Sequence, residues 1–188
     1  MTTINTLDAI ATRYSCRAYQ DKPVPVEILT KIAEAGLRAP SAKNRQPWRL
    51  IVVTDKAVMA EIERVGLETI RANDEEEFAR VQARGGTLTY QAPAVIIIAA
   101  QKLVSPYPVG EDVGIVAAHL ALAATALGVD SCIAARPRIG FMGQFGQALS
   151  DKYLPEGFEF GLSVLLGYAS APAGEKHEPD FAKLSFLD

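Results

Sequence analysis

Residues 113–135 read VGIVAAHLALAATALGVDSCIAA. The first part, 113–129, is rich in Ala and Leu and has no polar side, which predicts a helix that is buried all round. Residues 130–135 follow directly and predict a short strand. A helix without a polar face must be covered by other layers, so this stretch favours helices packed around a central sheet. The apolar run is shorter than a membrane span, so we expect no membrane partner.

The rest of the chain alternates between helical and strand patterns. Short runs rich in β-branched residues predict strands at 48–54, 94–100 and 159–168. Apolar periodicity predicts helices at 6–11, 26–38 and 56–65. Pro25 suits the start of the second helix because its fixed φ matches a first helical turn. Together these patterns predict an α/β or α+β sandwich around a central sheet.

Two segments have less regular patterns. Residues 68–84 include the run Asp74-Glu75-Glu76-Glu77, which indicates either a solvated helix face or a mobile lid over a site. The last twenty residues, 169–188, contain two prolines and a glycine, which exclude a long helix. We therefore expect the tail to run extended over a surface.

The composition is that of a globular chain. It has 188 residues, 49% of them hydrophobic, and 19 Lys and Arg against 22 Asp and Glu, for a net charge of −3. This length suits one domain over residues 1–188, and the mild acidity argues against a nucleic-acid partner. Two cysteines and no secretory pattern favour a cytoplasmic location. Because a buried helix and a long tail both need cover, we expect a homodimer.

Several familiar active-site motifs do not occur in the sequence. It has neither a G-x-G-x-x-G fingerprint nor a Walker A loop, and Gly161-Leu162-Ser163 lacks the glycine that completes a nucleophile elbow. His119 and His177 lie far apart without nearby cysteines, so we expect no metal site. Cys132 lies among apolar residues and is expected to be a small buried hydrophobe.

Three polar segments adjoin the predicted buried elements. Arg13–Arg17 (RYSCR) has two guanidinium groups around a hydroxyl, which suits a phosphate or belongs to a solvated surface loop. Arg38–Trp48 (RAPSAKNRQPW) carries Asn and Gln amides between two prolines, so it is either a heterocycle-binding loop or a plain connection. Gly128–Ala134 (GVDSCIA) either offers backbone N–H groups to a ligand or is only a turn from helix to strand.

Taken in order, four segments resemble the nitroreductase family of flavin enzymes. They read AIATRYSCRAYQDKPVP at 9–25, AGLRAPSAKNRQPWRLIVV at 35–53, DVGIVAAHLALAATALGVDSCI at 112–133 and GLSVLLGYASAPAGEKHEPDF at 161–181. Each segment is weak alone, and their order and spacing carry the resemblance over nearly the whole chain. It implies an α+β fold in which helices flank a central mixed, mainly antiparallel sheet, and a dimer with an extended C-terminal arm.

The resemblance also implies FMN as cofactor and two active sites at the interface of a homodimer. By this resemblance, Arg13, Ser15 and Arg17 hold the phosphate and ribityl chain, and Tyr14 contributes its backbone. Pro40, Ser41 and Asn44 would reach the flavin from the partner subunit, with Arg38 and Ala42 nearby. Cys132, Ile133 and Ala134 would lie along the ring and offer backbone N–H groups to N5 and O4.

The chain departs from the family pattern at two positions. The family usually completes its phosphate site with an arginine where this chain has His177, and Lys176 would take over that role. The family often has an asparagine where this chain has His119, for which we expect a role in the core or at an interface.

The activity implied by the resemblance is hydride transfer from NADH or NADPH through flavin N5 to a small-molecule acceptor. Nitroaromatics, quinones and similar electrophiles would be reduced in a ping-pong cycle, and no catalytic side chain is expected because the flavin does the chemistry. Alternatives within the same fold are flavin breakdown, dehalogenation and peptide oxidation. A non-catalytic protein that binds or stores FMN is a further alternative.

Overall fold

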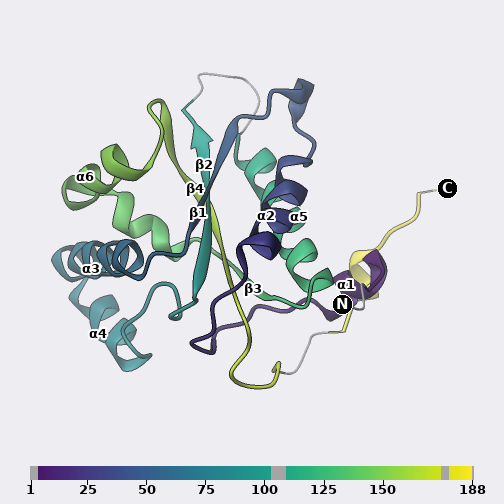
Figure 1. Ribbon diagram of the computed structural model, residues 1–188, viewed down its shortest axis with the longest axis horizontal. Helices are drawn as coiled ribbons and strands as arrows, with labels where there is room; N and C mark the ends of the chain where they lie inside the picture. The colour runs from purple at the N-terminus through teal and green to yellow at the C-terminus, as the bar shows by residue number, and fades with distance from the viewer. Residues whose placement is uncertain (1–3, 103–108, 175–177, 188) are drawn as a thin grey trace.

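The computed structural model describes residues 4–102, 109–174 and 178–187. At its centre is a sheet of β1 (Trp48–Val53), β2 (Ala94–Gln101), β3 (Asp130–Ala134) and β4 (Phe158–Gly167), in the order β1-β2-β4-β3 (Figure 1). All pairings between these strands are antiparallel. Within the described ranges, a parallel contact occurs only as the isolated bridge between Ser15 and Ser131. The fold is therefore α+β, as expected, with an antiparallel sheet.

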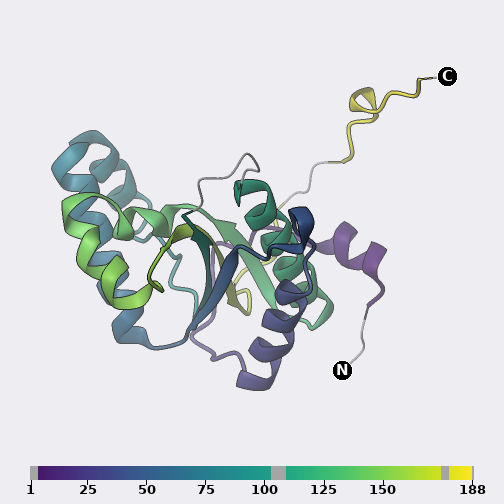
Figure 2. The ribbon, with the colours of Figure 1, turned by 90° about the horizontal axis from the view of Figure 1, so that it is seen from above.

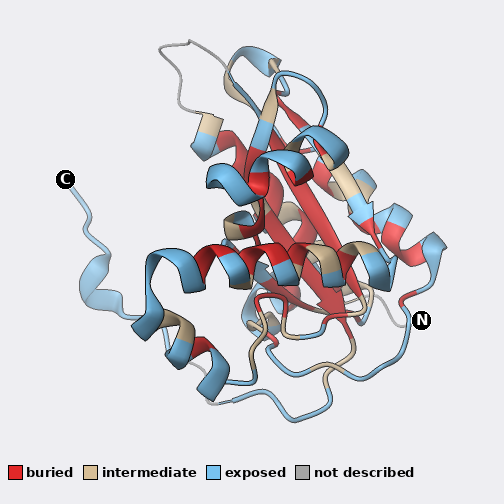
Figure 3. Ribbon diagram, turned by 90° about the vertical axis from the view of Figure 1, so that its left-hand side faces the viewer, coloured by how far each residue is buried: buried red, intermediate tan, exposed pale blue. Residues whose placement is uncertain are grey.

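Helices cover both faces of this sheet. One face carries α2 (Val26–Leu37) and α5 (Val109–Ala126), and the other carries α3 (Lys56–Asn73), α6 (Gly143–Tyr153) and the 3-10 helix η2 (Arg136–Phe141). Along β2, Ile96 and Ile98 face the first set of helices, whereas Val95 and Ile97 face the second. Because both faces are covered, β2 is buried up to Gln101 (Figure 3).

The predicted strands and helices all occur, but some boundaries differ. The helix predicted over 56–65 continues to Asn73, because Thr69 and Ile70 keep its inward side buried. Helix α6 was not predicted, since Gly143 and Gly146 weaken a helical pattern. In the structure Gly146 lies against the backbone of Phe141, where a Cβ atom would come within 2.4 Å of the Phe141 carbonyl carbon. Close packing therefore explains a glycine inside this helix.

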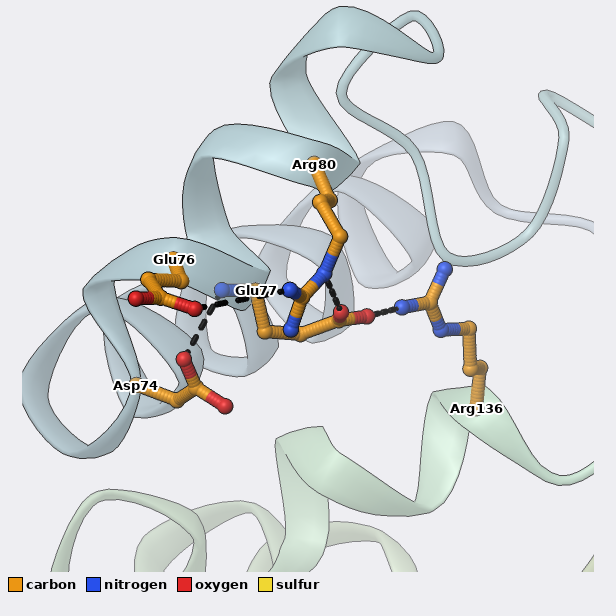
Figure 4. A network of polar contacts seen from close by, with 5 residues as sticks. All are labelled: Asp74, Glu76, Glu77, Arg80 and Arg136. Carbon is orange, nitrogen blue, oxygen red and sulfur yellow. Dashed lines mark hydrogen bonds and ion pairs between the residues drawn. The ribbon is translucent and has the colours of Figure 1, made fainter.

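The charged segment after α3 forms α4 (Glu75–Ala83). Val81 is buried and packs with Ile70 and Leu88, so one side of α4 belongs to a small core. On the polar side, Glu77 pairs with Arg80 and also with Arg136 at the start of η2 (Figure 4). The segment is thus a helix with one solvated face, as one alternative predicted, and it is held against the body rather than standing free as a lid.

Helix α5 differs from the prediction of a helix buried all round. Its inward residues, such as Val116 and Leu120, are fully buried, but Gly114, Ile115 and Ala118 are exposed in this chain. The prediction was wrong for the single chain because α2 and the sheet cover only part of the helix. At 18 residues, α5 also passes the length and composition test for a membrane span, as core helices of soluble proteins do.

The described part of the tail, residues 178–187, is exposed throughout and extends away from the body (Figure 2). It contains the short 3-10 helix η3 (Phe181–Lys183). Four large apolar side chains on it expose more than half of their surface, namely Phe181, Leu184, Phe186 and Leu187. The expectation that the tail lies over a surface is therefore not met within one chain.

Candidate functional site

The edge strand β3 carries the first part of the site. The segment after α1 (Thr6–Thr12) runs beside it, and the N–H of Cys16 donates to the carbonyl oxygen of Ser131 at 2.9 Å. Because backbone groups alternate along an antiparallel strand, those of Ile133 face the same free edge as those of Ser131. The N–H groups of Cys132 and Ala134 face β4 instead. Of these three residues, Ile133 is therefore the one placed to offer its N–H to a ligand.

Residues of the RYSCR segment surround a cavity beside this strand. The cavity has a volume of about 790 Å³ and is lined by Leu7, Ile10, Ala11, Arg13, Tyr14, Ser15, Arg17, Gly174, Glu178 and Pro179. A smaller space of about 230 Å³ adjoins Tyr14, Ser15 and Arg17 on the side of Ala171 and Pro172. Arg13 is half-buried and Arg17 is exposed, so both can present a positive charge to the cavity.

Cys132 links the RYSCR segment to β3. Burial raises the pKa of its thiol, while the charge of Arg17, a hydrogen bond with Ser15 and the charge of Arg13 act in the opposite direction. These interactions place Ser15 and both arginines close to Cys132, so the structure brings two of the three predicted segments together. The thiol is protonated at neutral pH, which agrees with its predicted role as a small buried hydrophobe.

Asp130 anchors the same region and was not predicted as a site residue. Burial and a hydrogen bond with Asp130 raise the pKa of the Tyr14 phenol, so Tyr14 is neutral at physiological pH. The Asp130 carboxylate also accepts the N–H of Ala169 at 2.8 Å. The only sign of this role in the sequence is a carboxylate at the helix-to-strand turn between Val129 and Ser131.

The third predicted segment lies elsewhere in the chain. Residues 38–46 form the connection between α2 and β1 at the upper right of Figure 1, whereas α1 lies at the lower right. None of the residues lining the cavities around Tyr14 comes from this connection. Within it, Arg38, Pro40 and Asn44 are exposed, and Ser41 and Ala42 are half-buried.

This connection, which we call the 38–46 loop, has an unusual backbone. Lys43, Asn44 and Gln46 have φ angles of 53°, 52° and 50°, a region that residues other than glycine seldom adopt. The Gln46 N–H donates to Ser41 Oγ at 2.8 Å, and the Gln46 side chain donates to Asn44 Oδ1 at 2.9 Å. Strained backbone of this kind persists where the surroundings hold it, and it is common at ligand sites. The 38–46 loop is therefore a candidate binding element.

Asp112 ties the 38–46 loop to α5, and sequence reasoning missed it. Its Oδ1 accepts the N–H of Ala42 at 3.1 Å, and its Oδ2 lies 3.8 Å from Arg45 Nη2. Asp112 is only 4% exposed. An acidic residue within an otherwise apolar helix was the available signal, because a buried carboxylate needs partners.

The sequence also singled out His119, Lys176 and His177. His119 is half-buried, and its Nδ1 lies 3.2 Å from the carbonyl oxygen of Ala35, which joins α5 to α2. The expected role in the core or at an interface stays a prediction. Lys176 and His177 lie outside the described residues. In the parts of the chain that the structure describes, no group of three metal-ligating side chains occurs.

The two arginines of the RYSCR segment and the N–H of Ile133 on the edge of β3 are donors that suit an anionic ligand, in a protein of the α+β class. Comparison with known families identifies the kind of protein. The sequence model of the nitroreductase family matches residues 10–140, which is more than half of the chain. The protein therefore belongs to the nitroreductase family.

Individual relatives agree with this assignment. A protein of Archaeoglobus fulgidus, provisionally named NADH dehydrogenase/NAD(P)H nitroreductase, is 31% identical over 179 residues, which are 93% of this chain and 88% of the relative. A nitroreductase with bound FMN from Desulfitobacterium hafniense DCB-2 is 38% identical, with a TM-score of 0.89 over 98% of this chain and 100% of its own. A nitroreductase with bound FMN from Bacteroides fragilis NCTC 9343 is 26% identical, with a TM-score of 0.84 over 99% and 100%.

Proposed function

We propose that this protein is an FMN-dependent NAD(P)H oxidoreductase that acts as a homodimer. The observation that carries the proposal is the cavity lined by Arg13, Ser15 and Arg17, in a segment that the bridge from Ser15 to Ser131 joins to the edge of β3. The Desulfitobacterium structure, which has the same fold, contains FMN. The name of the Archaeoglobus relative supports NADH or NADPH as the second substrate.

The residues around the cavity fit FMN in charge and size. Two guanidinium groups and a hydroxyl match the oxygen atoms of a phosphate. A volume of about 790 Å³ suits a ligand of this kind, since binding pockets usually measure roughly 300–1,000 Å³. The buried Ser131 Oγ has no hydrogen-bond partner within the described structure, and it lines an adjoining cavity with Arg13 and Tyr14. Such a hydroxyl is available to a ligand.

Bound FMN supplies hydride transfer at its N5 atom, and the chain binds and orients the cofactor. Arg13 and Arg17 would hold the phosphate of FMN, and the N–H of Ile133 would be available as a donor to its ring. Tyr14 helps to shape the site but cannot act as a base, because its raised pKa keeps the phenol protonated. NADH or NADPH and then an electrophilic acceptor would bind to the FMN-loaded protein in turn, which would give ping-pong kinetics.

The proposed dimer explains apolar surface that one chain leaves open. Ile115 and Ala118 of α5 are exposed, and so are Phe181 and Phe186 of the tail. Obligate interfaces are large and rich in apolar residues. A second copy would also bring its own 38–46 loop to a cavity that this chain's loop does not reach. Both cysteines are free thiols, which suits a cytoplasmic location.

Anaerobic titration of the FMN-loaded protein with NADH and with NADPH tests the proposal. We expect bleaching of the oxidised flavin spectrum by at least one nucleotide, followed by recovery when a nitroaromatic or a quinone is added. A colourless protein that does not bind added FMN would contradict the proposal. Tight FMN binding without nucleotide oxidation under any acceptor would identify a binding or storage protein instead.

The phosphate site can be completed by either of two residues near the tail. We propose that Lys176 or His177 supplies the cation for which the family usually uses an arginine. FMN affinity of His177→Ala and Lys176→Ala, measured by titration of the apoprotein, decides between them. The variant that loses affinity marks the residue involved, and unchanged affinity in both would contradict the assignment.

A further inference from the structure

The internal hydrogen bonds of the 38–46 loop do not by themselves decide where the loop lies. Ser41, Asn44 and Gln46 bond to one another, so these contacts hold the left-handed backbone in shape. The position of the loop relative to the helices depends on contacts that leave it. Those made by Asp112 reach across to α5.

The environment of Asp112 makes these contacts strong constraints. Asp112 is itself buried, next to Val113 and Val116 of the core, so its carboxylate is held away from water. A buried carboxylate is stable only when donors or cations face it. The partners that face it, the N–H of Ala42 and the guanidinium group of Arg45, both belong to the 38–46 loop. Moving the loop would therefore leave the charge of Asp112 buried without them.

Helix α5 connects the two elements that each chain would contribute to the cofactor sites of the proposed dimer. Its first turns hold the 38–46 loop through Asp112, and its other end leads through Gly128 into β3, which carries Ile133 (Figure 1). A shift of the loop relative to α5 would therefore move it from the position in which, in the proposed dimer, it reaches the cavity of the partner subunit.

We infer that Asp112 is a positioning residue for the cofactor site. It holds the Ser41–Asn44 part of the loop in a fixed position against α5, and it needs the negative charge of its carboxylate to do so. At 3.8 Å the contact with Arg45 is too long for a hydrogen bond and acts through charge. The inference rests on the proposed function, because that proposal assigns the loop to FMN.

The test compares Asp112→Ala and Asp112→Asn with the unmodified protein. FMN affinity is measured by titration of the apoprotein, and stability by thermal unfolding without FMN. We expect Asp112→Ala to raise the Kd for FMN about tenfold or more. Asp112→Asn should raise it less, because the amide oxygen still accepts the Ala42 N–H but does not pair with the charge of Arg45.

Glu63→Ala is the matched control. Glu63 is a half-buried carboxylate of α3 that holds another loop by accepting the N–H groups of Leu88 and Thr89 at 2.7 and 2.8 Å. It lines none of the cavities around Tyr14. We expect Glu63→Ala to lower the melting temperature while the Kd for FMN stays within about twofold.

Two results would overturn the inference. One is an Asp112→Ala protein that binds FMN as tightly as the unmodified protein, and the other is a Glu63→Ala protein that loses as much affinity. If Asp112→Ala does not fold, Asp112→Asn decides, and an unchanged Kd for that variant overturns the inference. Failure of the unmodified protein to bind FMN is a different result, which overturns the proposed function itself.

Discussion

The role proposed for Arg13 and Arg17 depends on the residues that surround them in the fold. Both belong to one short segment that would read as a surface loop on its own. The hydrogen bond from Cys16 to Ser131 holds this segment against β3, so the two guanidinium groups lie near Cys132 and beside the cavity. The position of the two arginines, and not their number, is the reason for proposing a phosphate site here.

Loss of either arginine should weaken FMN binding. Arg13→Gln and Arg17→Gln each remove charge-assisted hydrogen bonds to a phosphate, so we expect the Kd for FMN to rise about tenfold in each. Lysine at either position should cause a smaller loss, because the charge remains without the planar fork of donors. Arg64→Gln, on the solvated side of α3, is the control and should leave the Kd unchanged. Equal affinity in all these variants would contradict the site.

Tyr19 should make the stability of the protein fall at alkaline pH. Burial is the main cause that raises the pKa of its phenol, with Cys16 and Cys132 adding to it. The folded state therefore keeps this proton above about pH 10, where the unfolded chain loses it, so the free energy of unfolding falls as pH rises through that range. We expect Tyr19→Phe to match the unmodified protein at pH 7 and to lose less stability between about pH 9.5 and 11. Urea unfolding at each pH measures the free energy of unfolding. The same fall in this free energy with pH for both proteins would refute the prediction.

Helices α3 and α4 use carboxylates to hold neighbouring segments in place. Glu63 of α3 accepts bonds from Thr87, Leu88 and Thr89, including a very short one from the Thr89 hydroxyl. Glu77 of α4 pairs with Arg136, and both side chains of that pair are about one third exposed (Figure 4). Both carboxylates are half-buried, and they differ in their donors, which include two backbone N–H groups for Glu63 and are charged side chains for Glu77.

The two carboxylates should also differ in how much each contributes to the free energy of unfolding. Glu63→Ala leaves two backbone N–H groups without their acceptor, so we expect it to lower the free energy of unfolding by about 2–4 kcal/mol. Glu77→Ala should cost less than about 1 kcal/mol, and added salt should reduce that cost, because a partly exposed ion pair is screened. Urea unfolding at low and high salt measures both effects. Equal losses, or a loss for Glu77→Ala that salt does not change, would contradict this interpretation.

The molecule as a whole leaves apolar surface open on α5 and on the tail. One side of α5 is exposed although it carries no charge at Gly114, Ile115 or Ala118, and the tail exposes two phenylalanines. A single chain of this composition has little else with which to cover them. We therefore expect the folded unit to be a pair of chains.

Removal of residues 178–188 should weaken that pair. The deletion takes away four large apolar side chains that contact little of their own chain, so we expect dissociation at higher protein concentration than for the full-length protein. Sedimentation equilibrium measures this, with Lys183→Gln as the control for an exposed tail residue of little apolar surface. A full-length protein that is monomeric at micromolar concentration would refute the dimer, and an unchanged dissociation constant would exclude the tail from its interface.

Much of the fold could be predicted because its signals are local. The run AVIIIAA has the composition of a buried strand, and it forms β2 in the middle of the sheet. Helix α6 escaped prediction because one of its glycines, Gly146, packs against the backbone of Phe141, which lies outside the helix. The free edge of β3 could not be foreseen either, because it depends on strand order and not on the sequence of β3.

The amino-acid sequence alone determined the positions of the four strands and of most helices, the two arginines around Ser15 and the resemblance to the nitroreductase family. Periodicity and residue type act over a few neighbours, so these features are visible without a structure. Tertiary structure decided that Cys16 meets Ser131, that Ile133 offers the free N–H, and that Asp112 holds the 38–46 loop. The contacts of Cys16 and Asp112 join residues far apart in the chain, and the edge position of Ile133 depends on the strand order, so only the tertiary structure decides them.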